Sequence, residues 1–430
     1  MIKIFNKRKF INKYTIIFFW IISWISLNVS QENLQFDFYR DYPAIDLIKF
    51  IRSWTSIIFS PIIYLLIIFK FKFFNKNNNI ITFKIFAIYY FLQSISLVLN
   101  TENYSNLFWA NLIFFNVGIF LLLNFKDNLK LDYYLYYIGI FFLIIIFIIY
   151  FTKNFNVFLT TNAISFYSHY SELKINNLEN IPPRSSGLAR TSILLIIFLT
   201  SYYFLKKKNI FTYVGITMLA CTIILTQSRI VIFSYLLLII FFFHKSLNIK
   251  GRFKILFFYL IFPLVIIIIT IYLKTFIHQQ NNAESNNINI EKIYNRNPDQ
   301  TIYASTRYKD WNDIIEKTKK NYFLGYGIQA DRLLINQSAS NAFVYSFASG
   351  GVCGLLIFII IYVRTFLISS ILLSKYKTIK INRDFVLLSA AITNLFLLIR
   401  SFVENSFAVY GIDFLIFLIC SIICEKKYKK

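Results

Sequence analysis

The chain has 430 residues, of which 57% are hydrophobic and 20% aromatic, and its formal net charge is +25. A soluble domain of this length has no core for so many long apolar runs, so the composition excludes a soluble globular protein. Because most lysines lie in short clusters between apolar runs, the charge indicates membrane topology and nucleic acid is not expected as a partner.

The apolar runs predict an all-α, polytopic integral membrane protein that forms a single transmembrane domain over residues 1–430. The N-terminal stretch has the charge pattern of a signal peptide but lacks a small-x-small cleavage site, so we expect a retained first helix. Twelve membrane-spanning helices are predicted, at residues 14–30, 55–70, 80–99, 106–124, 133–151, 190–205, 209–226, 229–243, 254–274, 341–369, 384–400 and 407–424.

The charges between these segments predict their orientation. If the N-terminus is cytoplasmic, every predicted inner segment is basic, from "KIFNKRKFINK" at the start to "EKKYKK" at the end. The outer connections "TENYSN" and "SFVEN" contain no lysine or arginine. This pattern follows the positive-inside rule and predicts that both termini are cytoplasmic.

Three outer connections are too long to be simple turns: residues 31–54, 152–189 and 275–340. The loop at 152–189 ends in "IPPRSSGLAR", and the loop at 275–340 is the largest in the chain. In the latter, Trp311, Ile314, Ile315 and Thr318 recur at helical spacing, which predicts an amphipathic helix near the membrane. Since long loops usually carry function, we expect the chemistry on the outer face.

Several arginines lie at the predicted outer boundary, against the positive-inside trend: Arg184, Arg190, Arg229, Arg307 and Arg400. For each one alone, anchoring of a helix end is the simpler interpretation. Together they favour a site for a phosphate or diphosphate, because the guanidinium group binds phosphate oxygens in a bidentate manner. Pro182 and Pro183 stiffen the approach to Arg184 and Arg190, and Gly187 is expected to relieve crowding between them.

Few other residues suit catalysis. Glu404 lies four positions after Arg400, where it forms an ion pair with that arginine or acts as a general base; both remain open. Asp310 and Asp313 are interpreted as solvated, so no metal site is predicted and a metal-independent reaction is expected. His169 and His278 are interpreted as loop histidines, and the four cysteines show no metal-binding spacing and imply no disulfide.

Residues 180–430 resemble the superfamily of O-antigen ligases and Wzy-type polysaccharide polymerases. The resemblance rests on "RSSGLAR" before a span, "LTQSR" at a tight hairpin, "STRYKDWNDIIEKTKKNYFLGYG", and "SNAFVYSFASGGVCGLLIF". It implies a GT-C-like membrane glycosyltransferase of the bacterial inner membrane whose active site faces the periplasm. It also implies that Arg184, Arg190, Arg229 and Arg307 match the family's outer arginines, which hold an undecaprenyl diphosphate.

The chain departs from the ligases in one place. Ligases carry an "HNxxL" pattern where the large loop meets the next helix, whereas here Ser340 precedes Asn341. A serine is no general base at neutral pH without help. The departure favours a polymerase that joins undecaprenyl-diphosphate-linked oligosaccharide repeat units of O-antigen, capsule or exopolysaccharide.

In the polymerase hypothesis, Arg184, Arg190, Arg229 and Arg400 bind the diphosphate, Arg307 and Glu404 are catalytic, and Gly187 and Asn341 position the site. The expected partners are the lipid-linked donor and acceptor, membrane lipid and a chain-length regulator protein, and no cofactor is expected. Two alternatives remain: an O-antigen ligase that transfers polymer to lipid A core, and a flippase of lipid-linked oligosaccharides.

Overall fold

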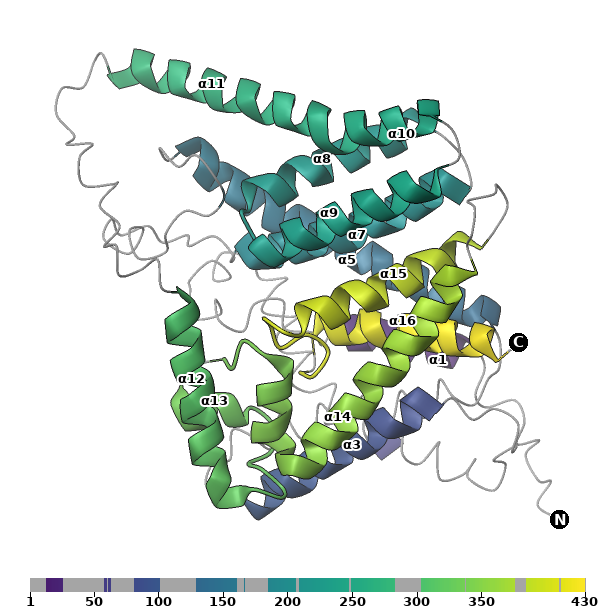
Figure 1. Ribbon diagram of the computed structural model, residues 1–430, viewed down its shortest axis with the longest axis vertical. Coiled ribbons are helices and arrows are strands. Elements are labelled where there is room, and N and C mark those ends of the chain that lie inside the picture. Colours follow the sequence, from purple (N-terminus) through teal and green to yellow (C-terminus); the bar gives the residue numbers. More distant parts are fainter. Residues whose placement is uncertain are drawn as a thin grey trace. The chain divides into compact units, whose positions relative to one another are not determined.

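The computed structural model describes residues 13–25, 58–59, 61–62, 81–100, 129–160, 166, 185–205, 209–246, 249–282, 303–336, 338–375, 384–409 and 411–429. Within these ranges the regular elements are all helices, which confirms the predicted all-α class (Figure 1). The predicted span at 106–124 and nearly all of the one at 55–70 lie outside the described residues, as do Arg184 and His169.

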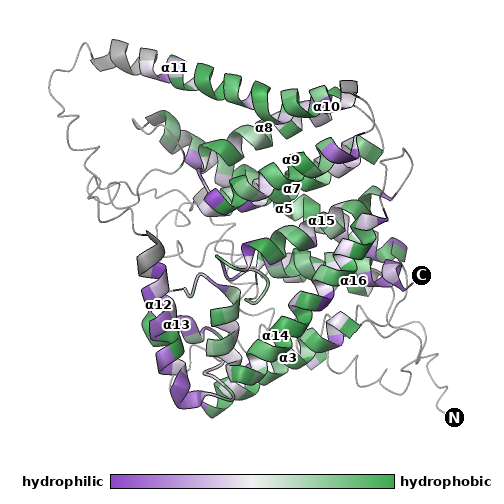
Figure 2. Ribbon diagram, viewed as in Figure 1, coloured by the Kyte–Doolittle hydropathy of each residue, from purple (hydrophilic) through white to green (hydrophobic). Residues whose placement is uncertain are grey.

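Four of the described helices are long and apolar enough to cross a membrane. They comprise residues Leu129–Thr152, Ser186–Leu205, Gly251–Thr275 and Ala342–Ser374. Shorter apolar helices occur at Tyr14–Ile25, Lys84–Leu99, Ile210–Leu225 and Phe385–Arg400. Figure 2 shows the hydrophobic residues spread along these helices, in contrast to the hydrophilic helix α12 (Tyr303–Thr318). The chain is therefore a membrane protein, and twelve spans with a large periplasmic loop stay a prediction.

The described residues form two compact units, which are considered separately. One contains residues 143–310 and 375–389. Its helices are the second half of α5 (Leu129–Thr160), α7 (Ser185–Leu205), α8 (Ile210–Leu225), α9 (Arg229–Lys245), α10 (Ile249–Leu256) and α11 (Phe262–Asn282), together with the first half of α12 and the start of α15 (Phe385–Arg400). Short connections fold α7, α8 and α9 back and forth, so α7 and α9 run in the same direction (Figure 1).

A π-helical turn at Phe257–Ile261 joins α10 to α11. Its cause is Pro263, which has no backbone N–H to donate to the carbonyl of Tyr259 four residues earlier. The hydroxyl of Tyr235 in α9 donates to this freed carbonyl instead. The Tyr259 hydroxyl in turn donates to Thr200 in α7 at 2.8 Å. The turn thereby joins three helices through polar groups that a membrane interior would otherwise leave unsatisfied.

The other unit contains residues 1–142, 311–374 and 390–430. Its described elements are α1 (Lys13–Ile25), α3 (Ile81–Leu99), the first part of α5, the second half of α12, α13 (Ala330–Ile335), α14 (Ala342–Ser374), the C-terminal part of α15 (Phe385–Arg400) and α16 (Ile412–Tyr428). All residues of α16 from 412 to 426 are buried, so this helix is the centre of the unit. Helix α3 packs antiparallel to α14: Thr82 contacts Arg364, and Gln93 contacts Ser349.

Helix α14 is interrupted at Gly351, whose φ of 61° and ψ of −156° are not helical. The segment that follows the 3-10 turn Lys319–Asn321 packs against this interruption and supplies the missing hydrogen bonds. The amide of Val352 donates to the carbonyl of Tyr322 at 2.9 Å, and the amide of Tyr326 donates to the carbonyl of Ala348 at 2.8 Å. The break was not predicted from the sequence, where residues 341–369 read as one continuous apolar span.

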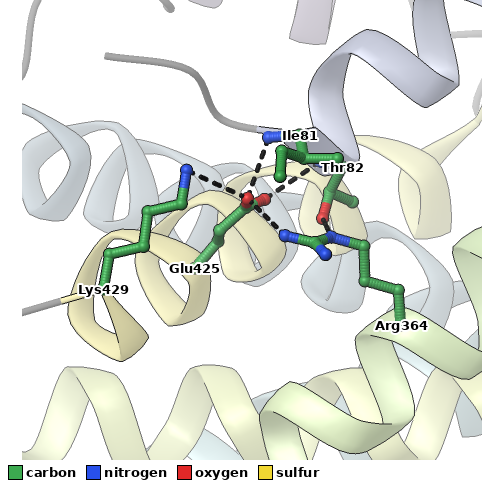
Figure 3. A network of polar contacts seen from close by, with 5 residues as sticks. All are labelled: Ile81, Thr82, Arg364, Glu425 and Lys429. Carbon is green, nitrogen blue, oxygen red and sulfur yellow. Dashed lines mark hydrogen bonds and ion pairs between the residues drawn. The ribbon is translucent and has the colours of Figure 1, made fainter. Parts of the chain in front are cut away.

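One buried carboxylate connects three helices of this unit, α3, α14 and α16 (Figure 3). The fully buried carboxylate of Glu425 accepts hydrogen bonds from the backbone amides of Ile81 and Thr82, at 2.8 and 3.0 Å. It also accepts one from Arg364 at 2.7 Å, and Lys429 lies 3.4 Å away. Glu425 thus satisfies amides at the N-terminus of α3 that have no partner within the helix. Nearby in sequence, Lys426 pairs with Asp132 of α5 at 2.6 Å.

The ends of the predicted outer loops are helical. Helix α5 continues to Thr160, α7 already begins at Ser185, and α11 continues to Asn282. Polar residues continue α5 beyond its apolar run, and there the side chain of Asn154 donates to the carbonyl of Tyr150 at 2.8 Å. His278 consequently lies in α11 rather than in an irregular loop.

Candidate functional site

In the unit of residues 143–310 and 375–389, the N-termini of α7 and α9 lie at the same end. Ser192 of α7 is hydrogen-bonded to Thr222 at 2.9 Å, close to the point where α8 ends and the chain turns into α9. Arg190 lies in the first turns of α7, and Arg229 is the first residue of α9. Helix N-termini carry partial positive charge and unpaired amides, so two of them beside two arginines form an electropositive end suited to an anion.

The two arginines differ in exposure. Arg190 is half-buried, whereas Arg229 is exposed, and its guanidinium forms no hydrogen bond or ion pair with the described residues. The turn before it places Gln227 in a left-handed conformation, with φ of 51°. Arg229 is therefore available to a ligand in a way that a paired cation is not. Arg184, the third predicted member of this group, lies outside the described residues.

Gly187 is needed for close packing rather than for an unusual backbone conformation. The residue is helical, and a Cβ atom added to it would lie 2.9 Å from a ring carbon of Tyr150 in α5. The sequence suggested that the glycine relieves crowding through its conformational freedom, but the structure gives a different reason. Tyr150 approaches α7 closely, directly before Arg190, so Gly187 fixes where the arginine-bearing end of α7 lies.

In the unit that includes residues 311–374 and 390–430, a polar network joins three segments. Asp331 of α13 accepts hydrogen bonds from the backbone amide of Ala339 at 2.8 Å and from the side-chain amide of Asn405 at 3.1 Å. Asn405 also donates to the hydroxyl of Ser338 at 3.0 Å and accepts from the backbone amide of Asn341 at 3.0 Å. The segment before α14 is thereby tied to the segment after α15.

The carboxyl group of Asp331 is only 3% exposed. Burial raises its pKa above the ordinary value, because the charged form is poorly solvated, and the hydrogen bonds from Ala339, Arg332 and Asn405 oppose this effect without cancelling it. A carboxylate so enclosed orders the surrounding chain rather than meeting a substrate directly. We therefore interpret Asp331 as the centre of a rigid support.

Asn341 caps α14. Its side-chain oxygen accepts hydrogen bonds from the amides of Phe343 and Val344, at 2.8 and 3.1 Å, and its side-chain nitrogen donates to the carbonyl of Phe402. Asparagine is among the best N-cap residues for this reason. The preceding residue, Ser340, adopts a left-handed conformation with φ of 47°. Asn341 thus has a structural task that accounts for its identity without any contact to substrate.

Arg400 is buried and its guanidinium is engaged within the protein. One of its nitrogens donates to Asp413 of α16 and to the hydroxyl of Ser406, the latter at 3.1 Å. The ion pair that the sequence suggested with Glu404 is not formed: Arg400 pairs with Asp413 instead, and only the backbone amide of Glu404 bonds to the carbonyl of Arg400. Arg400 therefore holds the 401–411 segment in place, and we do not assign it to diphosphate binding.

The half-buried side chain of Glu404 accepts no hydrogen bond from the described residues. Arg307 is also half-buried; it lies in the first half of α12, in the same unit as Arg190 and Arg229. No three metal-ligating side chains gather anywhere in the described ranges. Asp331 and Asn405 were not predicted from the sequence, because a lone aspartate in a long polar loop and an asparagine after a glutamate form no distinguishing pattern.

The described residues define a helical membrane protein in which one compact unit has an electropositive helix end and the other has a buried polar network. Residues 214–359, about a third of the chain, match the family model described as O-antigen ligase. The match confirms, over these residues, the resemblance predicted from the sequence, so this part of the chain is similar to the O-antigen ligase family. The matched segment contains Arg229, Arg307, Asp331 and Asn341. No curated protein and no solved structure matched the chain.

Proposed function

We propose that the protein is a membrane glycosyltransferase that polymerises oligosaccharide repeat units carried on undecaprenyl diphosphate. The observation that carries the proposal is the pair of parallel helix N-termini bearing Arg190 and Arg229. A diphosphate is the ligand whose charge and oxygen geometry suit amide groups and guanidinium groups at once. The match of residues 214–359 to the O-antigen ligase family model supports a reaction of polymerase or ligase type on such a lipid-linked substrate.

In the proposed reaction, a hydroxyl of the acceptor unit attacks the anomeric carbon of the donor chain. A new glycosidic bond forms, the bond from that carbon to the diphosphate oxygen breaks, and undecaprenyl diphosphate leaves with the negative charge. Arg184, Arg190 and Arg229 stabilise that charge as it develops, which lowers the barrier without any need for a metal. The proton from the attacking hydroxyl passes to Glu404, the general-base candidate.

Arg307 is proposed to position donor or acceptor. Asp331 and Asn405 hold the segment before α14 and the segment after α15 together, and this fixes the position of Glu404. Asn341 supports the same region as the N-cap of α14. Membrane orientation, with this chemistry on the periplasmic side of the bacterial inner membrane and both termini in the cytoplasm, is part of the proposal.

The test is an assay with purified protein and synthetic lipid-linked repeat units. We expect a ladder of products that differ by one unit, and its loss in Arg190→Ala and Arg229→Ala. Arg229→Lys keeps the charge but not the planar fork, so it should retain only partial activity. Normal ladders from both alanine variants would refute the assigned diphosphate site.

The ligase remains the second candidate, because the matching family model bears that description. The absence of a histidine before Asn341 favours the polymerase. Deletion in the native host separates the two: loss of a polymerase leaves single repeat units on the cell surface, whereas loss of a ligase leaves long polymer on the lipid carrier. Accumulation of lipid-linked polymer would therefore exclude the polymerase assignment.

A further inference from the structure

The turn between α12 and α13 presents three apolar side chains to the outside. Tyr322 is 50% exposed, Phe323 is 70% exposed and Leu324 is 37% exposed. All three lie within the sequence loop of residues 275–340, where no apolar span was predicted. Large apolar side chains at the tip of a loop are costly in water, so a contiguous set of them indicates a contact with something apolar.

The backbone of this turn is held rigidly. The carbonyl of Tyr322 accepts from Val352, and the amides of Tyr326 and Gly327 donate to carbonyls of Ala348 and Ser349, all between 2.8 and 2.9 Å. On the other side, Asn100 at the end of α3 donates to the carbonyl of Gly325 at 3.0 Å and accepts from Asn321 at 2.6 Å. The side chains of the turn therefore project outward from a fixed base.

The length of α14 locates the turn relative to the membrane. The part of α14 that follows the break at Gly351 comprises residues 352–374, or about 34 Å at 1.5 Å per residue, against a hydrocarbon core of roughly 30 Å. This part alone is therefore long enough to cross that core. The break, and the turn bonded to it, thus fall near one boundary of the bilayer.

The C-terminal end of α3 indicates that the turn lies near a boundary of the bilayer. Val98 and Leu99, the last two residues of this apolar helix, are exposed, and Ser96 one turn earlier donates to the carbonyl of Leu324. The exposed apolar surface of α3 therefore continues onto the turn. Lys319 and Lys320, directly before it, are exposed as well. Aromatic and aliphatic residues beside lysines are typical of segments at a lipid–water interface.

Helix α12 itself does not provide this contact. The residues that give it the amphipathic pattern face the protein: Ile314 is fully buried, and the Trp311 indole donates to the carbonyl of Ala339. The amphipathic pattern predicted from the sequence is thus explained by packing within the unit. Among residues 311–324, the large apolar side chains that are exposed all belong to the turn that follows α12.

We propose that the turn of Tyr322, Phe323 and Leu324 inserts into the lipid leaflet in which α3 ends and anchors the large loop to the membrane surface. Lipid is the occupant because the turn continues the exposed apolar surface of a helix in a membrane protein, with lysines at its edge for lipid phosphates. The proposal does not depend on the enzymatic activity.

A depth measurement tests it. Cysteine is placed at residue 323 (Phe323→Cys) in a chain whose four native cysteines are replaced by alanine, and a nitroxide label is attached. The protein is reconstituted into vesicles of phosphatidylethanolamine and phosphatidylglycerol. We expect the label to be relaxed more by oxygen, which partitions into lipid, than by a water-soluble nickel chelate. Leu99→Cys supplies the lipid-exposed reference, and Asn312→Cys, on the exposed face of α12, supplies the water-exposed one.

A label at residue 323 that behaves like the one at residue 312 would overturn the proposal. A second measurement avoids the cysteine replacements: benzoyl-phenylalanine is incorporated at position 323 of the otherwise unchanged chain and irradiated in the same vesicles. Cross-links to phospholipid are the expected result. Cross-links to a second protein chain, or none to lipid, would show that lipid is not the occupant.

Discussion

The carboxylate of Asp331 lies 3.1 Å from the side-chain amide nitrogen of Asn405, although 74 positions separate the two residues in sequence. This hydrogen bond closes the polar network between α13, the start of α14 and the segment after α15. Because Asn405 adjoins Glu404, the network also fixes the backbone of the general-base candidate. Loss of this hydrogen bond should therefore lower both the free energy of unfolding and the activity.

Asn405→Asp should destabilise the protein, because two carboxylates would then face each other in a buried place. Asp331→Asn should also destabilise it, since an amide nitrogen would oppose the donors that now serve the carboxylate. Each change is expected to lower the free energy of unfolding by about 1–3 kcal/mol. The double variant exchanges acid and amide and restores the pair. Thermal unfolding in detergent measures all four proteins as a double-mutant cycle, and losses that simply add in the double variant would contradict the coupling.

The raised pKa of Asp331 predicts a pH dependence with a definite sign. An aspartate whose pKa is raised on folding binds its proton more tightly in the folded state than in the unfolded state. Its contribution to stability is therefore largest below the unfolded pKa and is lost as the pH rises through the folded pKa. Asp331→Asn should remove this part of the pH dependence of the unfolding temperature. The control variant Asp313→Asn, at an exposed position, should leave that part unchanged. An identical pH profile in wild type and Asp331→Asn would contradict the prediction.

Much of the fold follows from the sequence, because a membrane requires long apolar runs that can be read directly. Helices α3, α8, α9 and α15 begin and end within a few residues of the predicted spans. The ends of α5 and α11 could not be predicted from hydropathy, since polar residues continue both helices beyond their apolar part. The division into two compact units was also not foreseen, because both units use the same kind of apolar helix.

Arg400 and Glu404 should respond differently to substitution. Removal of either partner of the buried Arg400–Asp413 pair leaves an uncompensated charge and should cost about 3–5 kcal/mol of stability. Glu404→Gln alters a side chain that bonds to none of the described residues, so the protein should unfold at the wild-type temperature while its rate of polymerisation falls. Unfolding curves and a single-turnover assay separate the two effects. Wild-type turnover in Glu404→Gln would remove Glu404 as the general base.

Glu425 and Glu316 form a matched pair for testing burial. Glu425 meets Arg364 at 2.7 Å and Glu316 meets Lys319 at 2.6 Å, but the first carboxylate is fully buried and the second is 68% exposed. Glu425→Ala should cost about 3–5 kcal/mol, because it also removes the acceptor of two amides at the start of α3. Glu316→Ala should cost about 0–1 kcal/mol. Urea unfolding of the two variants provides the comparison. Equal losses of unfolding free energy would show that Glu425 does not stabilise the contact between α3, α14 and α16.

The candidate site was predicted only in part. Arg190 and Arg229 could be assigned to one side of the membrane because alternating spans force α7 and α9 to run the same way, and the structure has their N-termini at one end. Arg400 lies at the end of a span in the same manner, and the sequence could not distinguish it. Its partner Asp413 is the second residue of α16, and only the folded chain brings the two together.

Two adjacent glycines in α14 should tolerate alanine very differently. Gly351 has a φ of 61°, and a Cβ atom there would lie 2.3 Å from backbone atoms of Phe323, so Gly351→Ala should displace the 322–325 turn and break the bonds that repair the interrupted helix. Gly350 is the control: the nearest atom to its added Cβ is a side-chain carbon of Leu92 at 3.9 Å. Gly350→Ala should be neutral or slightly stabilising, because alanine favours the helix. The fraction of monodisperse protein after extraction and the unfolding temperature measure both effects. Similar behaviour of the two variants would mean that α14 is continuous in the membrane and that the turn is not bonded to it.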